Sequence, residues 1–200
     1  MNSIITIGIT GGIGSGKSYI CRILEAMGYP VFYSDQVAKE ILATNPDAVN
    51  SVKELFGENA YSEDGTLNRP FLAEKIFSNQ SLRAKLNAII HPKVRLAFKK
   101  FSSEQSSHLV FNEAAIIFET GGHSQFDKTI LVSAPEALKI TRLLKRDKTD
   151  KSAIRKRMDS QWTDEQKRAL ADFEIVNDEQ LELLPQIMKI IERLEPQSHP

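Results

Sequence analysis

The sequence contains almost no cysteine, because Cys21 is the single one in 200 residues. An internal disulfide is therefore excluded, and a lone cysteine fits a protein of a reducing compartment. Long apolar runs are also lacking: Ile4–Ile9 and Ile130–Val132 are far shorter than the roughly 20 residues that cross a bilayer. The N-terminus has no basic region followed by an extended apolar stretch. We therefore expect a cytoplasmic protein that is neither secreted nor embedded in a membrane.

An excess of charge of either sign is lacking as well. The 26 Lys and Arg residues balance the 26 Asp and Glu residues. No global positive field exists that would hold nucleic acid or an acidic membrane by charge alone. We expect neither as a partner, and any anion that the protein binds must be held by a local site.

Short apolar segments rich in β-branched residues recur along the chain, separated by helical or loop sequence. Nearly continuous apolar character is typical of strands buried on both faces of a parallel sheet. Such strands are predicted at 3–10, 30–32, 109–111, 129–132 and 173–176. Helices are predicted from about 20 to 27, where Gly28 ends the pattern, at 36–42 and at about 180–194. This alternation favours an α/β fold in which helices cover a parallel sheet.

The region from about 46 to 103 differs in kind. It carries helical apolar patterns and no convincing strand, with a helix break expected at His91-Pro92. We interpret it as a helical insertion.

A glycine-rich motif follows the first predicted strand and precedes an amphipathic helix. The residues match G-x-x-x-x-G-K-[ST] in full: Gly11-Gly12-Ile13-Gly14-Ser15-Gly16-Lys17-Ser18. The glycines let successive backbone N–H groups point at phosphate oxygens, and the helix directs its positive end at the same charge. Lys17 supplies a cation to the β- and γ-phosphates, and Ser18 offers a hydroxyl ligand to Mg²⁺. The motif predicts a P-loop site for ATP or GTP; a glycine-rich turn with an incidental lysine is the alternative.

A basic stretch from Lys139 to Arg157 holds nine Lys and Arg residues. Arg142 and Arg146 are four residues apart, so one helix face would present both guanidinium groups. An arginine from a closing lid can neutralise the charge that develops during phosphoryl transfer. The alternative is a solvated helix face, which we expect for Lys139 and for Lys151 to Lys156.

P-loops serve GTPases, ATPases, motors and kinases, so the class must be inferred from other features. The GTPase motifs D-x-x-G and N-K-x-D are absent from the chain. A compact chain with a helical insertion suits a small-molecule kinase. A kinase acting on a nucleoside or another small alcohol, and a regulatory nucleotide-binding switch without an acceptor, remain alternatives.

An ordered set of motifs over nearly the whole chain resembles the dephospho-coenzyme A kinases. The set comprises Thr10 to Ser18, Ser34-Asp35, Ile90-His91-Pro92, Phe118-Glu119, Arg142-x-x-x-Arg146-Asp147, Gln161 and Ala171-Asp172-x-x-Ile175-x-Asn177. The resemblance implies transfer of the ATP γ-phosphoryl group to the ribose 3′-hydroxyl of dephospho-coenzyme A, giving coenzyme A and ADP. ATP, Mg²⁺ and dephospho-coenzyme A are thus the expected ligands.

The resemblance also implies roles for single residues. Asp35 matches the catalytic aspartate, Lys17 and Arg146 act on the transferred phosphoryl group, and Asn177 lies where the family recognises the adenine of ATP. The nucleotide-binding candidates are Gly12, Ile13, Gly14, Ser15, Gly16, Lys17, Ser18, Tyr19, Arg142 and Asn177. The acceptor-binding candidates are Thr10, Asp35, Arg69, His91 and Glu119.

Each of these roles has a plainer structural alternative. Asp35 would otherwise cap the helix that begins near Gln36. Arg69 would form a surface ion pair and Asn177 a turn. His91 has a structural hydrogen bond as its alternative, which we weigh above catalysis.

The chain departs from the family pattern at three places. Tyr33 stands where the family commonly has the first aspartate of Asp-Ala-Asp, and Tyr19 stands where it usually has threonine. Glu113 takes the place of an aspartate and would serve as a carboxylate of the outer Mg²⁺ shell.

The resemblance implies a three-layer α/β/α P-loop fold in three parts. The parts are a nucleotide-binding core at 1–45, 104–138 and 172–200, a helical domain for dephospho-coenzyme A at 46–103, and a basic helical lid at 139–171. We expect a monomer or a weak homo-oligomer.

Overall fold

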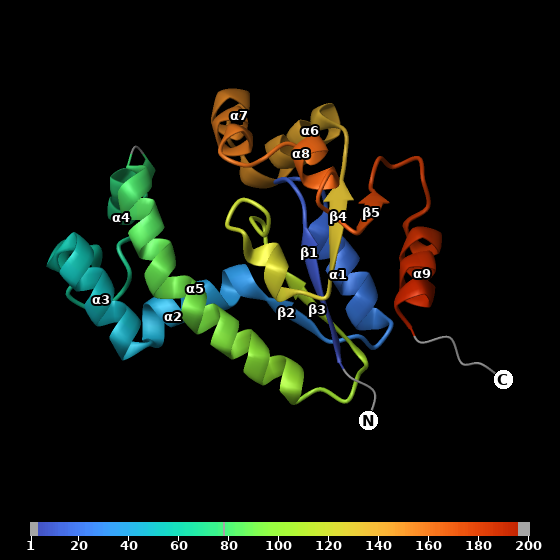
Figure 1. The fold of residues 1–200 in the computed structure, drawn as a ribbon. Helices are drawn as coiled ribbons and strands as arrows, with labels where there is room; N and C mark the ends of the chain where they lie inside the picture. The colour runs from blue at the N-terminus through green and yellow to red at the C-terminus, as the bar shows by residue number, and fades with distance from the viewer. Residues whose placement is uncertain (1–3, 78, 196–200) are drawn as a thin grey trace. The chain divides into compact units, whose positions relative to one another are not determined.

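The computed structural model describes residues 4–77 and 79–195. The predicted strand at 3–10 and the predicted core segments 1–45 and 172–200 therefore reach in part outside the described residues. The chain separates into two compact units, which are Met1–Tyr33 with Ser102–Pro200, and Ser34–Phe101. Figure 1 traces both along the chain.

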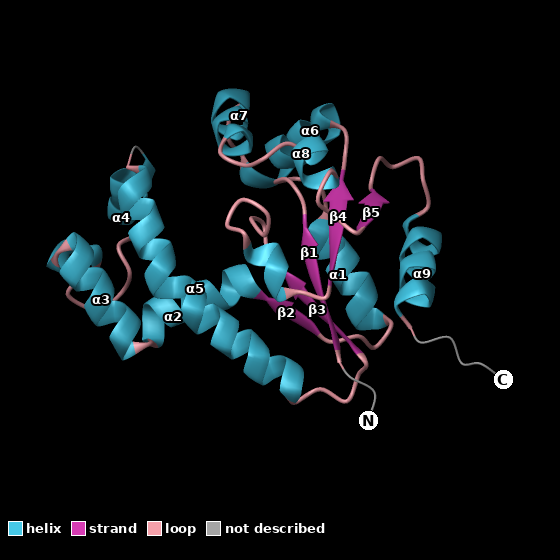
Figure 2. Cartoon of the chain, in the orientation of Figure 1, coloured by secondary structure: helices cyan, strands magenta, loops and turns pink. Residues whose placement is uncertain are grey.

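The first unit contains a sheet of five parallel strands (Figure 2). Its strands are β1 (Ile5–Thr10), β2 (Val31–Tyr33), β3 (Leu109–Glu113), β4 (Lys128–Ser133) and β5 (Phe173–Val176). The spatial order is β2-β3-β1-β4-β5, which places β1 at the centre. All five predicted strands are present, and the predicted α/β fold with a parallel sheet is confirmed.

The helices of this unit follow or connect the strands. They are α1 (Lys17–Ala26), the 3₁₀ turn η2 (Gly122–Gln125), α6 (Glu136–Asp147), α7 (Lys151–Asp159), α8 (Asp164–Arg168) and α9 (Leu183–Leu194). The C-terminal helix begins at Leu183 rather than near 180. Asp178 explains the delay, because its Oδ1 accepts hydrogen bonds from the N–H groups of Gln180 and Leu181 and so forms a turn there.

The core of the first unit lies between one face of the sheet and two helices. Side chains from all five strands meet apolar residues of α1 and α9; the buried set is Ile7, Ile9, Ile20, Cys21, Leu24, Val31, Leu109, Phe111, Ile130, Val132, Ile175, Ile187, Ile190, Ile191 and Leu194. On the opposite face, Gly8 leaves room for Phe126 and Ile117, because a Cβ there would lie 2.7 Å from the Phe126 ring. Both faces of β1 are thus covered, as its continuous apolar sequence predicts.

The second unit is built from helices around a core of its own. Its elements are α2 (Ser34–Thr44), α3 (Pro46–Phe56), the 3₁₀ turn η1 (Glu58–Ala60), α4 (Arg69–Phe77) and α5 (Gln80–Ser103). The core residues are Val52, Ala60, Tyr61, Leu72, Leu86 and Ile90. Among the described residues of this unit there is no strand, only an isolated bridge between Tyr61 and Leu67.

The predicted helix break at His91-Pro92 is wrong. Helix α5 continues through Pro92 for another eleven residues, to Ser103. Proline removes one backbone donor from the helix. Leu86 and Ile90 before it are buried in the core of the second unit, and Val94 after it packs on the same core. Tertiary packing on both sides of Pro92 therefore outweighs the local signal.

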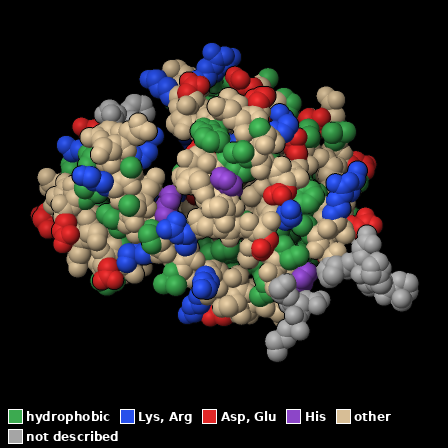
Figure 3. Space-filling model, viewed as in Figure 1, with side chains coloured by type: hydrophobic (Ala, Val, Ile, Leu, Met, Phe, Trp, Pro, Cys, Tyr) green, Lys and Arg blue, Asp and Glu red, His purple; other side chains and the backbone are tan. Residues whose placement is uncertain are grey.

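Charge and apolar length agree with the sequence analysis. On the face shown in Figure 3, basic and acidic side chains are interspersed over the described residues. Within the part of the chain that the structure describes, no helix is long and apolar enough to cross a membrane.

Two leucines on α5 test the core of the second unit. Leu86 is 6% exposed, whereas Leu96 is 70% exposed. Leu86→Ala is expected to lower the free energy of unfolding by about 2–5 kcal/mol, because it removes buried methyl groups and leaves a cavity. Leu96→Ala should change it by no more than about 0.5 kcal/mol. Urea unfolding of both variants measures the difference, and equal losses would contradict the assigned core.

Candidate active site

The P-loop motif forms the connection between β1 and α1. Gly16 takes the N-cap position of α1 in a left-handed conformation, with φ 96°, and no side chain caps the helix. Lys17 is therefore its first residue and Ser18 its second. Unsatisfied N–H groups and the helix dipole make such a terminus attractive to an anion. The local geometry is that of a phosphate-binding loop.

The Lys17 ammonium lies at the end of β1 beside two acceptors. Its Nζ donates to the Gly11 carbonyl at 2.9 Å and lies 3.8 Å from Oε1 of Glu113, the last residue of β3. Both side chains are about 10% exposed. Glu113 is thus a buried carboxylate next to the loop, where the sequence suggests an outer-shell Mg²⁺ carboxylate.

Cys21 packs one turn into α1 below this pair. Burial, with a further contribution from the Glu113 charge, raises the pKa of its thiol to about 12. The thiol is therefore neutral, and it is a core residue rather than a nucleophile.

Arg142 and Asn177 hold the loop from outside. The Arg142 guanidinium donates to the carbonyls of Gly14 and Ser15 at 3.4 and 3.3 Å, and to Oδ1 of Asn177 at 3.1 Å. The Asn177 amide donates to the Ser15 carbonyl at 2.8 Å. Two predicted nucleotide-binding residues from distant parts of the chain therefore meet at the loop.

The same corner of the molecule holds a cavity of about 510 Å³. Tyr19, which is 53% exposed, lines it together with Gly16, Arg142 and Asn177. Leu181 and Leu183 add apolar surface. A flat group with an apolar face and polar edges would suit this lining.

Arg146 faces a carboxylate of its own helix. Its Nε and Nη2 donate to the two oxygens of Asp147, at 2.5 and 3.1 Å, and Arg157 donates to Asp147 at 2.6 Å. The hydrogen bond from Arg146, followed by that from Arg157, holds the pKa of Asp147 far below its usual range. This carboxylate stays ionised, so it joins α6 to α7 through two arginines.

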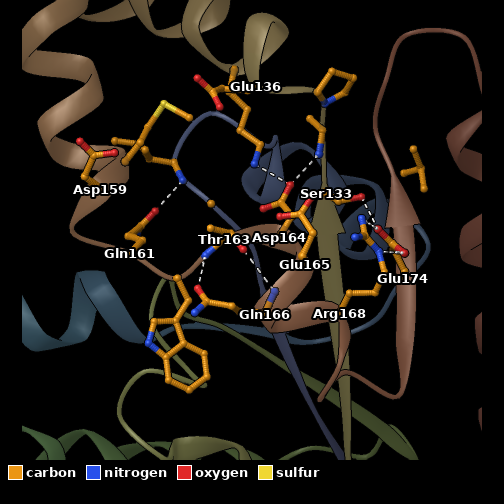
Figure 4. A pocket seen from close by; sticks show the side chains of 18 of the residues that line it. Ser133, Glu136, Asp159, Gln161, Thr163, Asp164, Glu165, Gln166, Arg168 and Glu174 are labelled. Carbon is orange, nitrogen blue, oxygen red and sulfur yellow. Dashed lines mark hydrogen bonds and ion pairs between the residues drawn. The ribbon is translucent and has the colours of Figure 1, made fainter.

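The expectation that Lys139 belongs to a solvated face is wrong. Lys139 is 7% exposed, and its Nζ lies 2.5 Å from Oδ2 of Asp164. A Cβ on Gly12 would lie 3.2 Å from the same Nζ. Figure 4 shows Asp164 also accepting from the Ala134 backbone, at 3.3 Å. Burial of the ion pair therefore places α6 and α8 directly against the P-loop.

Helix α8 carries a second buried charge on Lys167, three residues after Asp164. Lys167 is fully buried, and its Nζ contacts Oε1 of Glu119 at 2.8 Å and the Ala115 carbonyl at 3.2 Å. The Thr10 hydroxyl donates to the same carbonyl at 3.2 Å. Oε2 of Glu119 is buried and has no hydrogen-bond partner among the described residues. Two predicted acceptor-binding residues are thus held in place: Thr10 by the Ala115 carbonyl of the segment after β3, and Glu119 of that segment by Lys167.

The remaining acceptor candidates belong to the second unit. Helix α2 begins at Ser34, so the exposed Asp35 lies inside its first turn rather than before it, and the capping alternative is wrong. Arg69 is exposed at the start of α4. Neither side chain has a hydrogen bond or ion pair with the described residues, so both are available to a ligand.

His91 is half-buried inside α5. Burial, and then the charge of Arg95, lower the pKa of its imidazole, which is therefore neutral at physiological pH. A neutral imidazole offers one donor and one acceptor.

Tyr33 stands at the position of the family's first aspartate, so a phenol takes the place of that carboxylate. Tyr33 donates to Oε2 of Glu25 at 2.9 Å, and burial followed by this hydrogen bond raises its pKa. It therefore remains a neutral donor and supplies no carboxylate.

Sequence reasoning gave no role to four residues that surround the loop. They are Lys139, Gln161, Asp164 and Lys167. The start of α8 was detectable, because Thr163 and Gln166 form a capping box, whose sequence pattern is local. The two buried ion pairs join residues that are separated by 25 and by 48 positions in the chain. No local sequence pattern therefore predicts their burial.

Comparisons with known proteins agree on one family. A family model described as "Dephospho-CoA kinase" matches residues 5–182. A dephospho-CoA kinase of Bacteroides fragilis is 39% identical over 98% of this chain and 95% of its own length. A dephospho-CoA kinase of Salinibacter ruber is 42% identical over 86% of this chain and 88% of its own length. A crystal structure from Thermus thermophilus has a TM-score of 0.86 and 32% identity, covering 97% of this chain and all of its own.

Gly16 and Gly28 form a matched pair for testing the loop. Their φ angles are 96° and 91°, but a Cβ on Gly16 would lie 2.2 Å from Nδ2 of Asn177, whereas nothing lies within 4 Å of one on Gly28. Each change to alanine should cost about 1–2 kcal/mol of stability through backbone strain. Only Gly16→Ala should weaken ATP binding, by about tenfold or more, because displacing Asn177 disturbs the loop. Urea unfolding and calorimetric titration with ATP check this; equal ATP affinity in both variants would contradict it.

Proposed function

This chain belongs to the dephospho-CoA kinase family, and on that premise we propose that it transfers the γ-phosphoryl group of ATP to the ribose 3′-hydroxyl of dephospho-CoA. The family's reaction is the ATP-dependent phosphorylation of dephospho-CoA in coenzyme A biosynthesis. The observation that carries the proposal is the uncapped start of α1, where Lys17 follows a loop that fits a phosphate chain.

The loop and its neighbours account for ATP. The phosphate chain binds to the loop N–H groups, with Lys17 beside the β- and γ-phosphates. The adenine enters the cavity lined by Tyr19, Arg142 and Asn177. Because the Asn177 side chain already bonds to the Ser15 carbonyl and Arg142, its role is to hold loop and cavity together. Tyr19 offers an aromatic face in place of the family's small hydroxyl.

Ser18 and Glu113 fit a magnesium ion that accompanies the nucleotide. Ser18 is exposed in the first turn of α1, and the buried Glu113 lies at the end of the neighbouring strand β3. Among the described residues there is no group of three His, Cys, Asp or Glu side chains that could hold a metal. Ser18 would therefore be the protein ligand, with Glu113 in the outer shell and the phosphates completing the site, as is usual for Mg²⁺. The ion would neutralise phosphate charge.

Asp35 is the proposed general base. It stands two residues after Tyr33, the last residue of β2, and parallel sheets bind ligands beyond the carboxyl ends of their strands. An exposed carboxylate without a partner among the described residues can accept the proton of the attacking hydroxyl. Arg69 and His91 are proposed to contact dephospho-CoA, with the Arg69 guanidinium suited to a phosphate.

Arg146 is the proposed lid arginine. Its guanidinium is held by Asp147, and its side chain is 60% exposed. Exchange of this carboxylate for phosphoryl oxygens would bring positive charge to the transition state. The proposal divides the chain into three parts: a lid at 139–171, an acceptor domain at 46–103 and a core at 1–45, 104–138 and 172–200. It also includes a cytoplasmic location and a monomeric or weakly associated state.

The acceptor specificity is tested by incubating the protein with Mg-ATP and a panel of alcohols. ADP release should be stimulated by dephospho-CoA and not by nucleosides or small alcohols, since the family match extends from residue 5 to residue 182 and so spans the second unit. A coupled assay for ADP and mass analysis of the product measure this. Stimulation by a nucleoside alone would favour a different P-loop kinase, and slow hydrolysis indifferent to every acceptor would favour a nucleotide switch.

Asp35→Asn tests the general base against a matched aspartate. Asp47 also lies exposed in the first turn of its helix, α3, where its Oδ2 is 3.6 Å from the Lys93 Nζ. Asp35→Asn should lower kcat by about 10²–10⁴-fold with little change in ATP affinity, because it removes only the proton acceptor. Asp47→Asn should leave kcat within about twofold. Steady-state kinetics and ATP titration decide, and unchanged turnover in Asp35→Asn would refute its role.

A further inference from the structure

Gln161 belongs to the motif set of the family but has no role so far. It lies between α7 and α8, and its Oε1 accepts a hydrogen bond from the Ile13 N–H of the P-loop at 2.8 Å (Figure 4). Only the oxygen of a carboxamide can accept, so this bond fixes which way the group faces. The Nε2 amino group, with two N–H donors, points away from Ile13. It has no hydrogen bond with the residues that the structure describes.

A nucleotide bound along the P-loop would have its terminal phosphate near Gln161. The cavity assigned to adenine is lined by Gly16 and Tyr19, at the end of the loop where α1 starts. A second cavity, of about 1010 Å³, is lined by Gly12 and Ile13, at the other end of the loop. A nucleotide with its base at Gly16 therefore extends its terminal phosphate toward Ile13 and Gln161.

The side chains that line this second cavity carry mixed charges: the basic Lys139, Arg155 and Arg168, and the acidic Glu136, Asp159, Asp164, Glu165 and Glu174. Next to the loop, the Lys139 Nζ is the cation closest to Gly12. Asp164 is paired with Lys139, so the carboxylate does not act on the cavity alone. The Gln161 amide, which also lines the cavity, adds a neutral hydrogen-bond donor that a phosphate oxygen could accept from.

The segment that carries Gln161 is anchored by three contacts of the residues that directly follow it. The Trp162 N–H donates to Oε1 of Glu119 at 3.1 Å, directly after Gln161. Asp164 and Lys167 then form the two buried ion pairs with Lys139 and Glu119. Groups that are fixed before binding lose little freedom when a ligand arrives, so a contact from Gln161 is effective.

We propose that Gln161 binds the γ-phosphoryl group of ATP through Nε2, while its Oε1 stays on the Ile13 N–H, and that this contact separates ATP from ADP. The inference rests on the proposed function, because it requires ATP in the P-loop. Gln161 is then a binding residue of the transferred group.

Gln161→Glu is the deciding variant, because it is nearly isosteric and keeps an acceptor for the Ile13 N–H. It replaces the donor with a negatively charged oxygen. ATP should bind about tenfold or more weakly, through loss of a charge-assisted hydrogen bond and repulsion from the γ-phosphate. ADP should bind within about threefold of the parent protein, because it lacks the group that Gln161 contacts. Calorimetric titrations of ATP and ADP with Mg²⁺ measure both dissociation constants.

Gln166→Glu is the matched control. Gln166 lines the same cavity, and its Oε1 likewise accepts a backbone N–H, that of Thr163 at 2.9 Å. The change adds the same charge to the cavity but away from the loop, so the ratio of ATP to ADP affinity should stay within about twofold. An equal change of this ratio in both variants would assign the effect to cavity charge and overturn the inference.

A merely structural role of Gln161 predicts other results. It predicts that Gln161→Glu leaves both affinities unchanged, or that it weakens ATP and ADP equally through a distorted loop; either result overturns the inference and leaves the proposed function standing. Gln161→Ala gives a second reading if the glutamate variant is unstable, with a selective loss for ATP of about three- to tenfold expected. Failure of the parent protein to bind ATP would instead refute the proposed function, and the inference with it.

Discussion

The start of α1 has to stay open for an anion, and much of the first unit follows from that constraint. Side chains close some helix starts: Asn45 caps α3, Asp150 caps α7 and Thr163 caps α8, whereas α6 and α9 have no side-chain cap. At α1, Gly16 stands in this position and offers no side-chain cap either, directly after a glycine loop. N–H groups left without partners destabilise a terminus unless a ligand satisfies them. Phosphate binding would therefore satisfy these N–H groups and stabilise the start of α1.

An open loop needs support from outside, and tertiary contacts provide it. Helix α6 lies against Gly12 and Gly14, and Asn177 occupies the space that a side chain on Gly16 would need. Behind these contacts are two ion pairs, Lys139 with Asp164 and Lys167 with Glu119. A buried ion pair adds little net stability, but loss of one partner leaves an uncompensated charge. The pairs thus favour one arrangement of α6, α8 and the segment after β3, and this arrangement positions Gln161 on Ile13.

The second unit presents its charged side chains differently from the first unit. Its helices enclose their own apolar core and leave Asp35 and Arg69 exposed, without partners among the described residues. Groups of this kind are available for a polar ligand, whereas the first unit buries Lys17 and Glu113 beside the loop. The family match spans both units, from residue 5 to residue 182.

The sequence by itself determined the features that arise from neighbouring residues. Five apolar strands, the glycine loop and the helix after it were predictable, because strand propensity, turn chemistry and helix periodicity act within a few positions. Only the tertiary structure decided that α5 passes through Pro92, that Lys139 is buried and that Gln161 meets Ile13. Each of these depends on partners far away in the chain, whose burial energy overrides the local preference of the residue itself.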